Sequence, residues 1–173
     1  MDKTFLIRLE STLGKIKKTL LLNKDIRKLL FYDSATIAQQ QSEDNIPFEE
    51  LDVPAIELVR DNIFLQPVVE IDNNPPFNKK VFISITSPSM GFETEDSVEY
   101  AIKVSVQVDK TNWVFDDNKI RVYRLAQEVI NELDGEKYDC ATELAFEQML
   151  ETITDKTVTG KSLLFSIVDG VGE

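Results

Sequence analysis

The sequence predicts an α+β domain, with a mostly antiparallel sheet of about four to five strands and helices packed on one face. Three observations support this prediction. Apolar residues recur at helical spacing near the N-terminus, later segments have the two-residue period of strands, and two strand blocks flank a helical pattern at 120–133. A chain of 173 residues is long enough to bury a sizeable core, so we expect a single domain over residues 1–173.

The N-terminal part, residues 1–32, is predicted to be helical. Its apolar residues have the three- and four-residue spacing of an amphipathic helix: Phe5, Leu6, Leu9, Leu13, Ile16 and Leu20. The polar run at 23–25 ends this stripe, and Asp25 is of a residue type that caps helices. We therefore expect a second, shorter helix that carries Ile26, Leu29 and Leu30.

The composition then changes over residues 33–60. The segment 39–45 is polar and has no period, and Pro47 and Pro54 both discourage a continuous helix. We interpret residues 33–60 as a long polar loop or insertion, and residues 61–170 as the sheet with its crossing helix.

The middle of the chain has strand character. A short run at 68–71 stops at a turn cluster at 72–76, and a second strand is expected over 80–86. Over 98–108, apolar and polar residues alternate, which predicts a half-buried strand with one wet or partner-covered face. The residues at 89–97 between these strands are expected to form a loop or hairpin tip.

The C-terminal third predicts a helix and a hairpin. Asp116, Asp117 and Asn118 are candidate caps for a helix that runs to Leu133, and Gly135 is expected to end it. The segment 142–153 fits either a helix or a strand. We favour a strand, because a turn at 159–161 and an apolar run at 162–169 provide a hairpin partner.

The charge of the chain is unevenly distributed. The formal net charge is −12, but residues 1–30 hold eight bases and three acids, or +5, whereas the remainder holds 11 bases and 28 acids, or −17. The acidic body disfavours non-specific nucleic-acid binding. The basic start is either the solvated face of a helix or a docking surface for an acidic partner, in which case Lys15, Lys17 and Lys18 form a subunit interface.

Most chemical motifs are absent or incomplete. The chain has no histidine, which excludes His-dependent nucleophiles and most zinc sites, and Cys140 stands alone. The triplet at 160–162 lacks the glycine and the following helix of a phosphate loop. A magnesium site would have to draw on Asp109, Asp116, Asp117 and Glu128, of which Asp116 and Asp117 are better explained as helix caps. We expect no catalytic residue, metal or cofactor, and no targeting or membrane-spanning segment.

Two aromatic residues are candidates for a subunit contact. Trp113 and Phe115 follow the long strand at 98–108 and lie in a predicted loop. They either close the core or act as an aromatic anchor at a subunit interface, where Trp is enriched.

In the order of its elements and in the residue types of its segments, the chain resembles the tail terminator (tail completion, or head-to-tail joining) proteins of tailed bacteriophages, in particular those of crAss-like and other Bacteroidales phages. The resemblance covers most of the chain outside 34–60. It is carried by the segment 26–33 (Ile-Arg-Lys-Leu-Leu-Phe-Tyr-Asp), the long strand at 100–109, the helix at 120–135, the segments 144–149 and 151–153, the turn with Gly160, and the final strand at 163–169.

The resemblance implies a tail-terminator-like fold and a non-enzymatic structural protein of the virion, assembled in the host bacterial cytoplasm. Such proteins form rings, commonly hexamers, that end the tail tube and join it to the head-side connector or portal while DNA passes through. An acidic channel would let DNA slide without binding. We therefore expect several of four acids to face the lumen or its rim: Glu93, Glu95, Asp96 and Glu99.

Three alternatives stay open at the level of the sequence. One is another neck protein of the same virion, such as an adaptor under the portal. A second is a small magnesium-dependent enzyme that uses the acidic cluster, and a third is a free-standing binding module of a host cell. No interaction with a membrane is expected.

Overall fold

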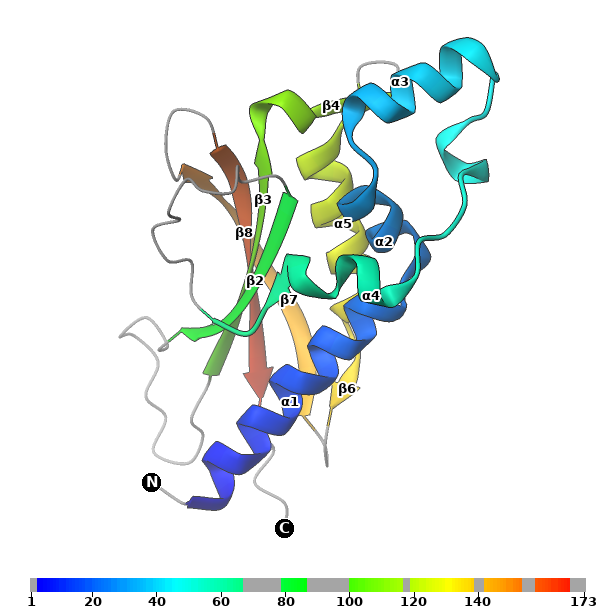
Figure 1. Ribbon diagram of the computed structural model, residues 1–173. Helices are drawn as coiled ribbons and strands as arrows, with labels where there is room; N and C mark the ends of the chain where they lie inside the picture. The colour runs from blue at the N-terminus through cyan, green and yellow to red at the C-terminus, as the bar shows by residue number, and fades with distance from the viewer. Residues whose placement is uncertain are drawn as a thin grey trace.

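A six-stranded mixed sheet carries helices on one of its faces (Figure 1). The computed structural model describes residues 3–66, 79–86, 100–116, 119–138, 142–153 and 158–168. The strand order is β1-β2-β3-β8-β7-β6, and a separate two-stranded sheet joins β4 (Val114–Asp116) to β5 (Lys119–Ile120). The α+β class is thereby confirmed. The predicted strand at 68–71 and the predicted loop at 89–97 lie outside the described residues.

The sheet differs from the prediction in size and in one orientation. β2 (Lys79–Thr86), β3 (Tyr100–Asp109), β8 (Val158–Val168) and β7 (Thr142–Ile153) form its antiparallel centre, as expected. Two very short strands extend this centre at either end. β1 (Ile63–Phe64) pairs parallel to β2, which makes the sheet mixed, and β6 (Lys137–Tyr138) pairs antiparallel to β7.

The N-terminal helices form as predicted, but with a different cap. α1 (Lys3–Leu22) buries Ile16 and Leu20, and α2 (Lys24–Phe31) follows after one residue. The cap of α2 is Asn23, whose side-chain oxygen accepts a hydrogen bond of 2.9 Å from the backbone N–H of Ile26. The prediction that Asp25 caps this helix is therefore wrong, because Asp25 lies within its first turn.

The polar segment 33–60 is folded, and the prediction of a loop or insertion is wrong for much of it. It forms α3 (Ser34–Glu43), the 3-10 turn η1 (Phe48–Glu50), α4 (Ile56–Val59) and the start of η2 (Arg60–Asn62). Asp33 caps α3 by accepting a hydrogen bond of 2.6 Å from the N–H of Thr36. Glutamine is a good helix former, so a cap and one buried anchor, Ile37, suffice for a helix that is otherwise polar.

The crossing helix α5 (Arg121–Leu133) starts later than its predicted caps. Lys119 and Ile120 pair with β4 as β5, so Ile120 occupies the cap position and makes no side-chain cap bond. The N–H of Arg121 instead donates to the carbonyl of Trp113 at 2.6 Å. The predicted C-terminal end is confirmed, because Gly135 has a φ of 78°, a conformation that glycine adopts readily.

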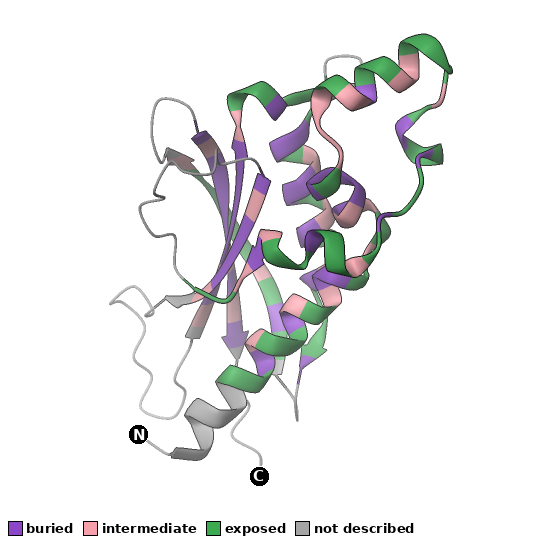
Figure 2. Cartoon of the chain, in the orientation of Figure 1, coloured by how far each residue is buried: buried purple, intermediate pink, exposed green. Residues whose placement is uncertain are grey.

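The core lies between the helices and the sheet. Figure 2 shows buried residues concentrated where α5 and α2 face the strands. The fully buried members include Leu125 and Val129 of α5 and, on the facing side of β3, Ile102, Val104, Val106 and Val108. The alternation in 98–108 therefore predicted the core face of β3 correctly for the residues that are described.

The opposite face of β3 is more buried than the solvent-exposed face that the sequence allowed for. Ser105 and Gln107 are 1% and 0% exposed, and the hydroxyl of Ser105 lies 3.0 Å from that of Ser162 on β8. Gly160, which faces Gln107 across the strands, lies within β8 and not in the predicted turn. A Cβ at Gly160 would overlap the carbonyl oxygen of Val106, so glycine is required here by close strand approach.

Candidate assembly surfaces

Among the described residues, the outer edge of β7 is open over much of its length. β6 pairs with β7 only at Thr142 and Glu143. The next outward bonds join Leu144 to the 135–136 turn, and the N–H of Phe146 donates to the Asp134 carboxylate at 2.8 Å. Within the described parts of the chain, no strand lies on the outer side of β7 beyond this point. Such an edge is a template for pairing with another chain.

We define the β7 edge as residues 147–151, all five of which are exposed. Met149 and Leu150 are 43% and 46% exposed and point to opposite faces, as consecutive strand residues do. Glu147 and Glu151 flank them. This arrangement places an apolar centre between two carboxylates on a strand whose outer side has no described partner strand here. Charges on an edge strand restrict the partners that can pair with it.

The carboxylates of the β7 edge are held in place by neighbours on β8. Glu147 accepts a hydrogen bond of 2.6 Å from Ser166, and Glu151 forms an ion pair of 2.7 Å with Lys161. The hydrogen bond from Lys161 lowers the pKa of Glu151, and the same contact raises the pKa of Lys161. The contact with Lys161 therefore favours the ionised form of Glu151.

A second candidate surface lies on α1 and its neighbours. α1 carries five bases and one acid, a net charge of +4. Of the predicted interface residues, Lys15 and Lys18 are exposed and Lys17 is half-buried. At the C-terminal end of the same helix, Leu22 is 55% exposed. The structure thus places these lysines at the surface, where the subunit interface stays a prediction.

This surface extends over the β1 end of the sheet. α1 packs against α4, β1 and β2, and Leu58 of α4 is 59% exposed, while Leu65, directly after β1, is 45% exposed. We define the α1 edge as the exposed lysines and leucines of these elements, together with half-buried Lys17: Lys15, Lys17, Lys18, Leu22, Leu58 and Leu65.

A third exposed group surrounds the β4–β5 hairpin. Val114 and Ile120 are cross-strand partners and are 51% and 37% exposed. Tyr123, in the first turn of α5, is 45% exposed, and the ammonium of Lys161 lies 4.6 Å from its ring centroid. Lys161 thereby connects the hairpin group to the β7 edge through Glu151. The sequence analysis missed this group, because a valine and an isoleucine cannot be recognised as exposed before the register of their strands is known.

Trp113, one of the two residues predicted as an aromatic anchor, lies against the core of its own subunit. Trp113 is half-buried and packs against the core. The side chain of Phe115 lies outside the described residues, and so do the four candidate lumen acids, Glu93, Glu95, Asp96 and Glu99. The apolar side chains that this region exposes are the neighbouring Val114 and Ile120.

Two buried cations at the end of α2 were not predicted. Arg121, fully buried, donates from Nε to the carbonyl of Asn112 at 2.7 Å and from Nη1 to that of Leu29 at 2.6 Å. Lys79, 1% exposed, donates to the carbonyls of Phe31 and Tyr32 at 3.2 and 2.8 Å. The last carbonyls of a helix lack intrahelical partners, so both cations satisfy groups that α2 leaves unpaired.

Burial shifts the pKa values of both groups. Burial, reinforced by the charge of Arg121, lowers the pKa of Lys79 to about 7, and burial lowers the pKa of Arg121 to about 10. Asp33 acts in the opposite direction on both groups. The donors of these cations point at backbone carbonyls, so their arrangement fixes the junction of α2, β2 and α5.

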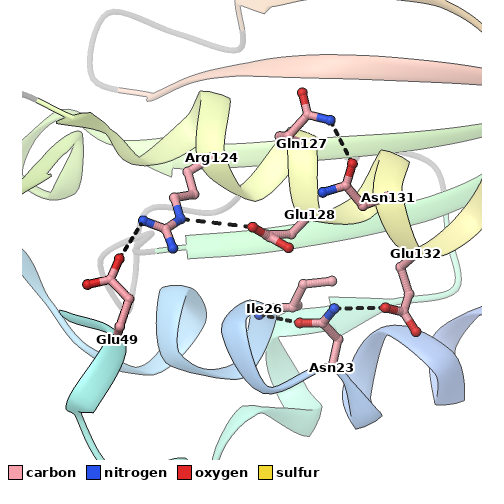
Figure 3. A network of polar contacts seen from close by, with 8 residues as sticks. All are labelled: Asn23, Ile26, Glu49, Arg124, Gln127, Glu128, Asn131 and Glu132. Carbon is pink, nitrogen blue, oxygen red and sulfur yellow. Dashed lines mark hydrogen bonds and ion pairs between the residues drawn. The ribbon is translucent and has the colours of Figure 1, made fainter.

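The polar face of α5 forms an internal network (Figure 3). Asn23 donates to Glu132 at 2.8 Å, and Arg124 reaches Glu49 at 3.2 Å and Glu128 at 3.9 Å. Burial and the nearby Asp25 raise the pKa of Glu128. The network binds the α1–α2 junction and η1 to α5, so it holds the helical layer together.

Asp109 and Glu128, the two acids considered for a magnesium site whose side chains are described, have other partners. Glu128 faces Arg124, and Asp109 caps η3 (Lys110–Asn112) by accepting from the N–H of Thr111 at 2.8 Å. The side chain of Asp116 and the whole of Asp117 lie outside the described residues. Among the residues whose positions are described, no three acidic or thiol side chains are grouped so that they could share a metal ion.

The comparisons with known proteins do not assign a family. No protein-family model matches the chain, and no curated protein matches it. None of the described helices is both long and apolar enough to cross a membrane.

Proposed function

We propose that this chain is a structural subunit that forms a closed ring at the head–tail junction of a tailed bacteriophage. In this role it ends the tail tube, joins it to the head-side connector, and lets DNA pass through the ring. The observation that supports the proposal best is the open, acidic β7 edge, because a free strand edge with exposed Met149 and Leu150 is suited to pairing with another subunit.

The charges of the β7 edge favour a ring over a two-fold dimer. If two β7 strands paired with each other, each would bring Glu147 and Glu151 and no base of its own to the contact. Contacts between surfaces of like charge are disfavoured. A different surface is therefore the better partner for the β7 edge, and repeated contacts between two different surfaces form a ring when the rotation between neighbours closes.

The resemblance of element order to phage tail terminators supports the location of this ring. The body of the chain carries a formal charge of −17 outside its first 30 residues, which suits a conduit that DNA must not bind. The lining of the lumen by Glu93, Glu95, Asp96 and Glu99 stays a prediction within this proposal.

Electron microscopy of the purified chain and of virions that carry it tests the proposal. We expect negatively stained particles with a central hole and rotational symmetry, and gold-labelled antibody at the neck of the virion. Label on the capsid wall or at the distal tail would contradict the location. Binding of the rings to portal particles in preference to tail-tube ends would assign them to an adaptor position instead.

A further inference from the structure

We infer that, in the ring, the β7 edge of one copy contacts the α1 edge of the next copy. This inference rests on the proposed ring and names the two surfaces that close it. It assigns a partner to each surface: the acidic, strand-edge surface at residues 147–151, and the basic surface formed by α1 with Leu58 and Leu65.

The positions of the two surfaces suit a head-to-tail contact. β1 is one end strand of the six-stranded sheet, and β7, covered by β6 only at its beginning, forms most of the other end. α1 packs beside β1 and β2 and also against α5, and its Thr19 lies near Tyr138 of β6, so α1 crosses the helix-covered face of the sheet, whereas the β7 edge lies along a strand edge. A heterologous contact requires two such separate surfaces on each subunit.

The charges of the two surfaces are complementary. The β7 edge presents Glu147, which accepts from Ser166, and Glu151, which is 74% exposed in its side chain and pairs with the nearly buried Lys161. The α1 edge presents Lys15, Lys17 and Lys18. Opposite potentials across a contact raise the association rate and exclude self-pairing of either surface.

Apolar side chains occupy the middle of each surface. Met149 and Leu150 lie between the two carboxylates, while Leu22, Leu58 and Leu65 accompany the lysines, and each of these five side chains is at least 43% exposed. Subunit contacts commonly have an apolar centre with a charged rim.

Mass photometry of two complementary full-length variants tests the assignment. The first, Glu147→Lys with Leu150→Lys, disrupts only the β7 edge, and the second, Lys18→Glu with Leu58→Glu, disrupts only the α1 edge. Each variant alone should remain a monomer. An equal mixture should form particles of two or more chains, because one intact contact remains between the two variants and the other contact places reversed charges of opposite sign against each other. Glu43→Lys, an exposed charge reversal on α3, is the matched control and should form the wild-type ring.

The outcomes separate this inference from the proposed function. The assignment would be overturned if both variants still formed the wild-type ring. It would also be overturned if the two variants were monomeric alone and stayed monomeric when mixed. Neither outcome would contradict the proposed ring of the wild-type chain. A wild-type chain that is monomeric would overturn both. Circular dichroism checks whether each variant is folded. If a double variant does not fold, the single changes Glu147→Lys and Lys18→Glu replace the double variants, and we expect each single change to cause a partial loss of the ring.

Discussion

The guanidinium of Arg124 lies 5.1 Å from the ring centroid of Phe48, with which it forms a cation–π contact. Phe48 is fully buried although it comes from the polar segment after α3. On the same ring, the ammonium of Lys28 lies 6.0 Å from the centroid, and it donates to the carbonyl of Glu49 at 2.6 Å. The polar segment is thus anchored to α2 and α5 by one aromatic residue between two cations.

Removal of this anchor should destabilise the subunit. Phe48→Ala should lower the free energy of unfolding by about 3–5 kcal/mol, the usual loss for truncating a buried aromatic residue. Phe31→Ala is the matched control, because Phe31 is 43% exposed, and its loss should be clearly smaller. Urea denaturation measures both values, and equal losses would show that Phe48 is no anchor.

The cap of α2 can be identified by a pair of neighbouring substitutions. Asn23→Ala removes the bond to the N–H of Ile26 and the bond to Glu132, so it should cost about 1 kcal/mol or more. Asp25→Ala removes no cap bond and should cost less. The free energies of unfolding from denaturant titrations decide between them, and a larger loss for Asp25→Ala would reinstate the cap that the sequence predicted.

Two glycine substitutions should have opposite effects. Gly160→Ala places a Cβ against the carbonyl of Val106 and should lower stability by about 1–3 kcal/mol, the usual cost of overpacking. Gly14 is an exposed residue of α1, and apart from the neighbouring backbone of the helix itself, no atom lies within 4 Å of the Cβ that Gly14→Ala adds. This substitution should raise stability by about 0.5–1 kcal/mol, because alanine favours helix. Thermal unfolding of both variants checks the two signs, and a neutral Gly160→Ala would contradict the close strand approach.

Stability should rise with pH because of Lys79. Its folded-state pKa of about 7 lies below its ordinary value of 10.5, so the unfolded state binds more protons between these two pH values. The free energy of unfolding therefore increases with pH across this window, by up to about 1.4 kcal/mol per unit. Below about pH 7 both states are protonated and the contribution of Lys79 is constant.

Lys79→Met isolates this effect. The variant should lose the rise in stability between pH 7.5 and 9.5, whatever the cost of leaving the carbonyls of Phe31 and Tyr32 without a donor. Arg121 and Asp33, the charged groups that act on Lys79, are unchanged in the variant. Urea titrations at several pH values compare the two proteins, and parallel pH profiles would contradict a depressed pKa.

The fold was predictable where one apolar face determines a segment. The stripe that includes Ile16 and Leu20 and the alternation through Val104 and Val106 each identify an element, because burial of a single face sets the period. α3 was missed because its one buried residue, Ile37, gives no period, and its cap at Asp33 is equally typical of a turn.

Features that depend on tertiary contacts could not be predicted. Nothing near Lys79 or Arg121 in the sequence distinguishes a buried cation from a surface one, because their partners are carbonyls of α2 far along the chain. The role of Gly160 likewise depends on strand register. The predicted lysines of α1 are on the surface, whereas the β7 edge became visible only once the sheet order was known.

The mass of the purified full-length chain in solution tests the central claim most directly. Mass photometry should give one dominant closed species, and for a hexamer six copies of 19.7 kDa amount to about 118 kDa. A different single ring mass would change the stoichiometry and keep the claim. A chain that stays at the mass of a monomer, or that forms an open-ended series of masses, would contradict it.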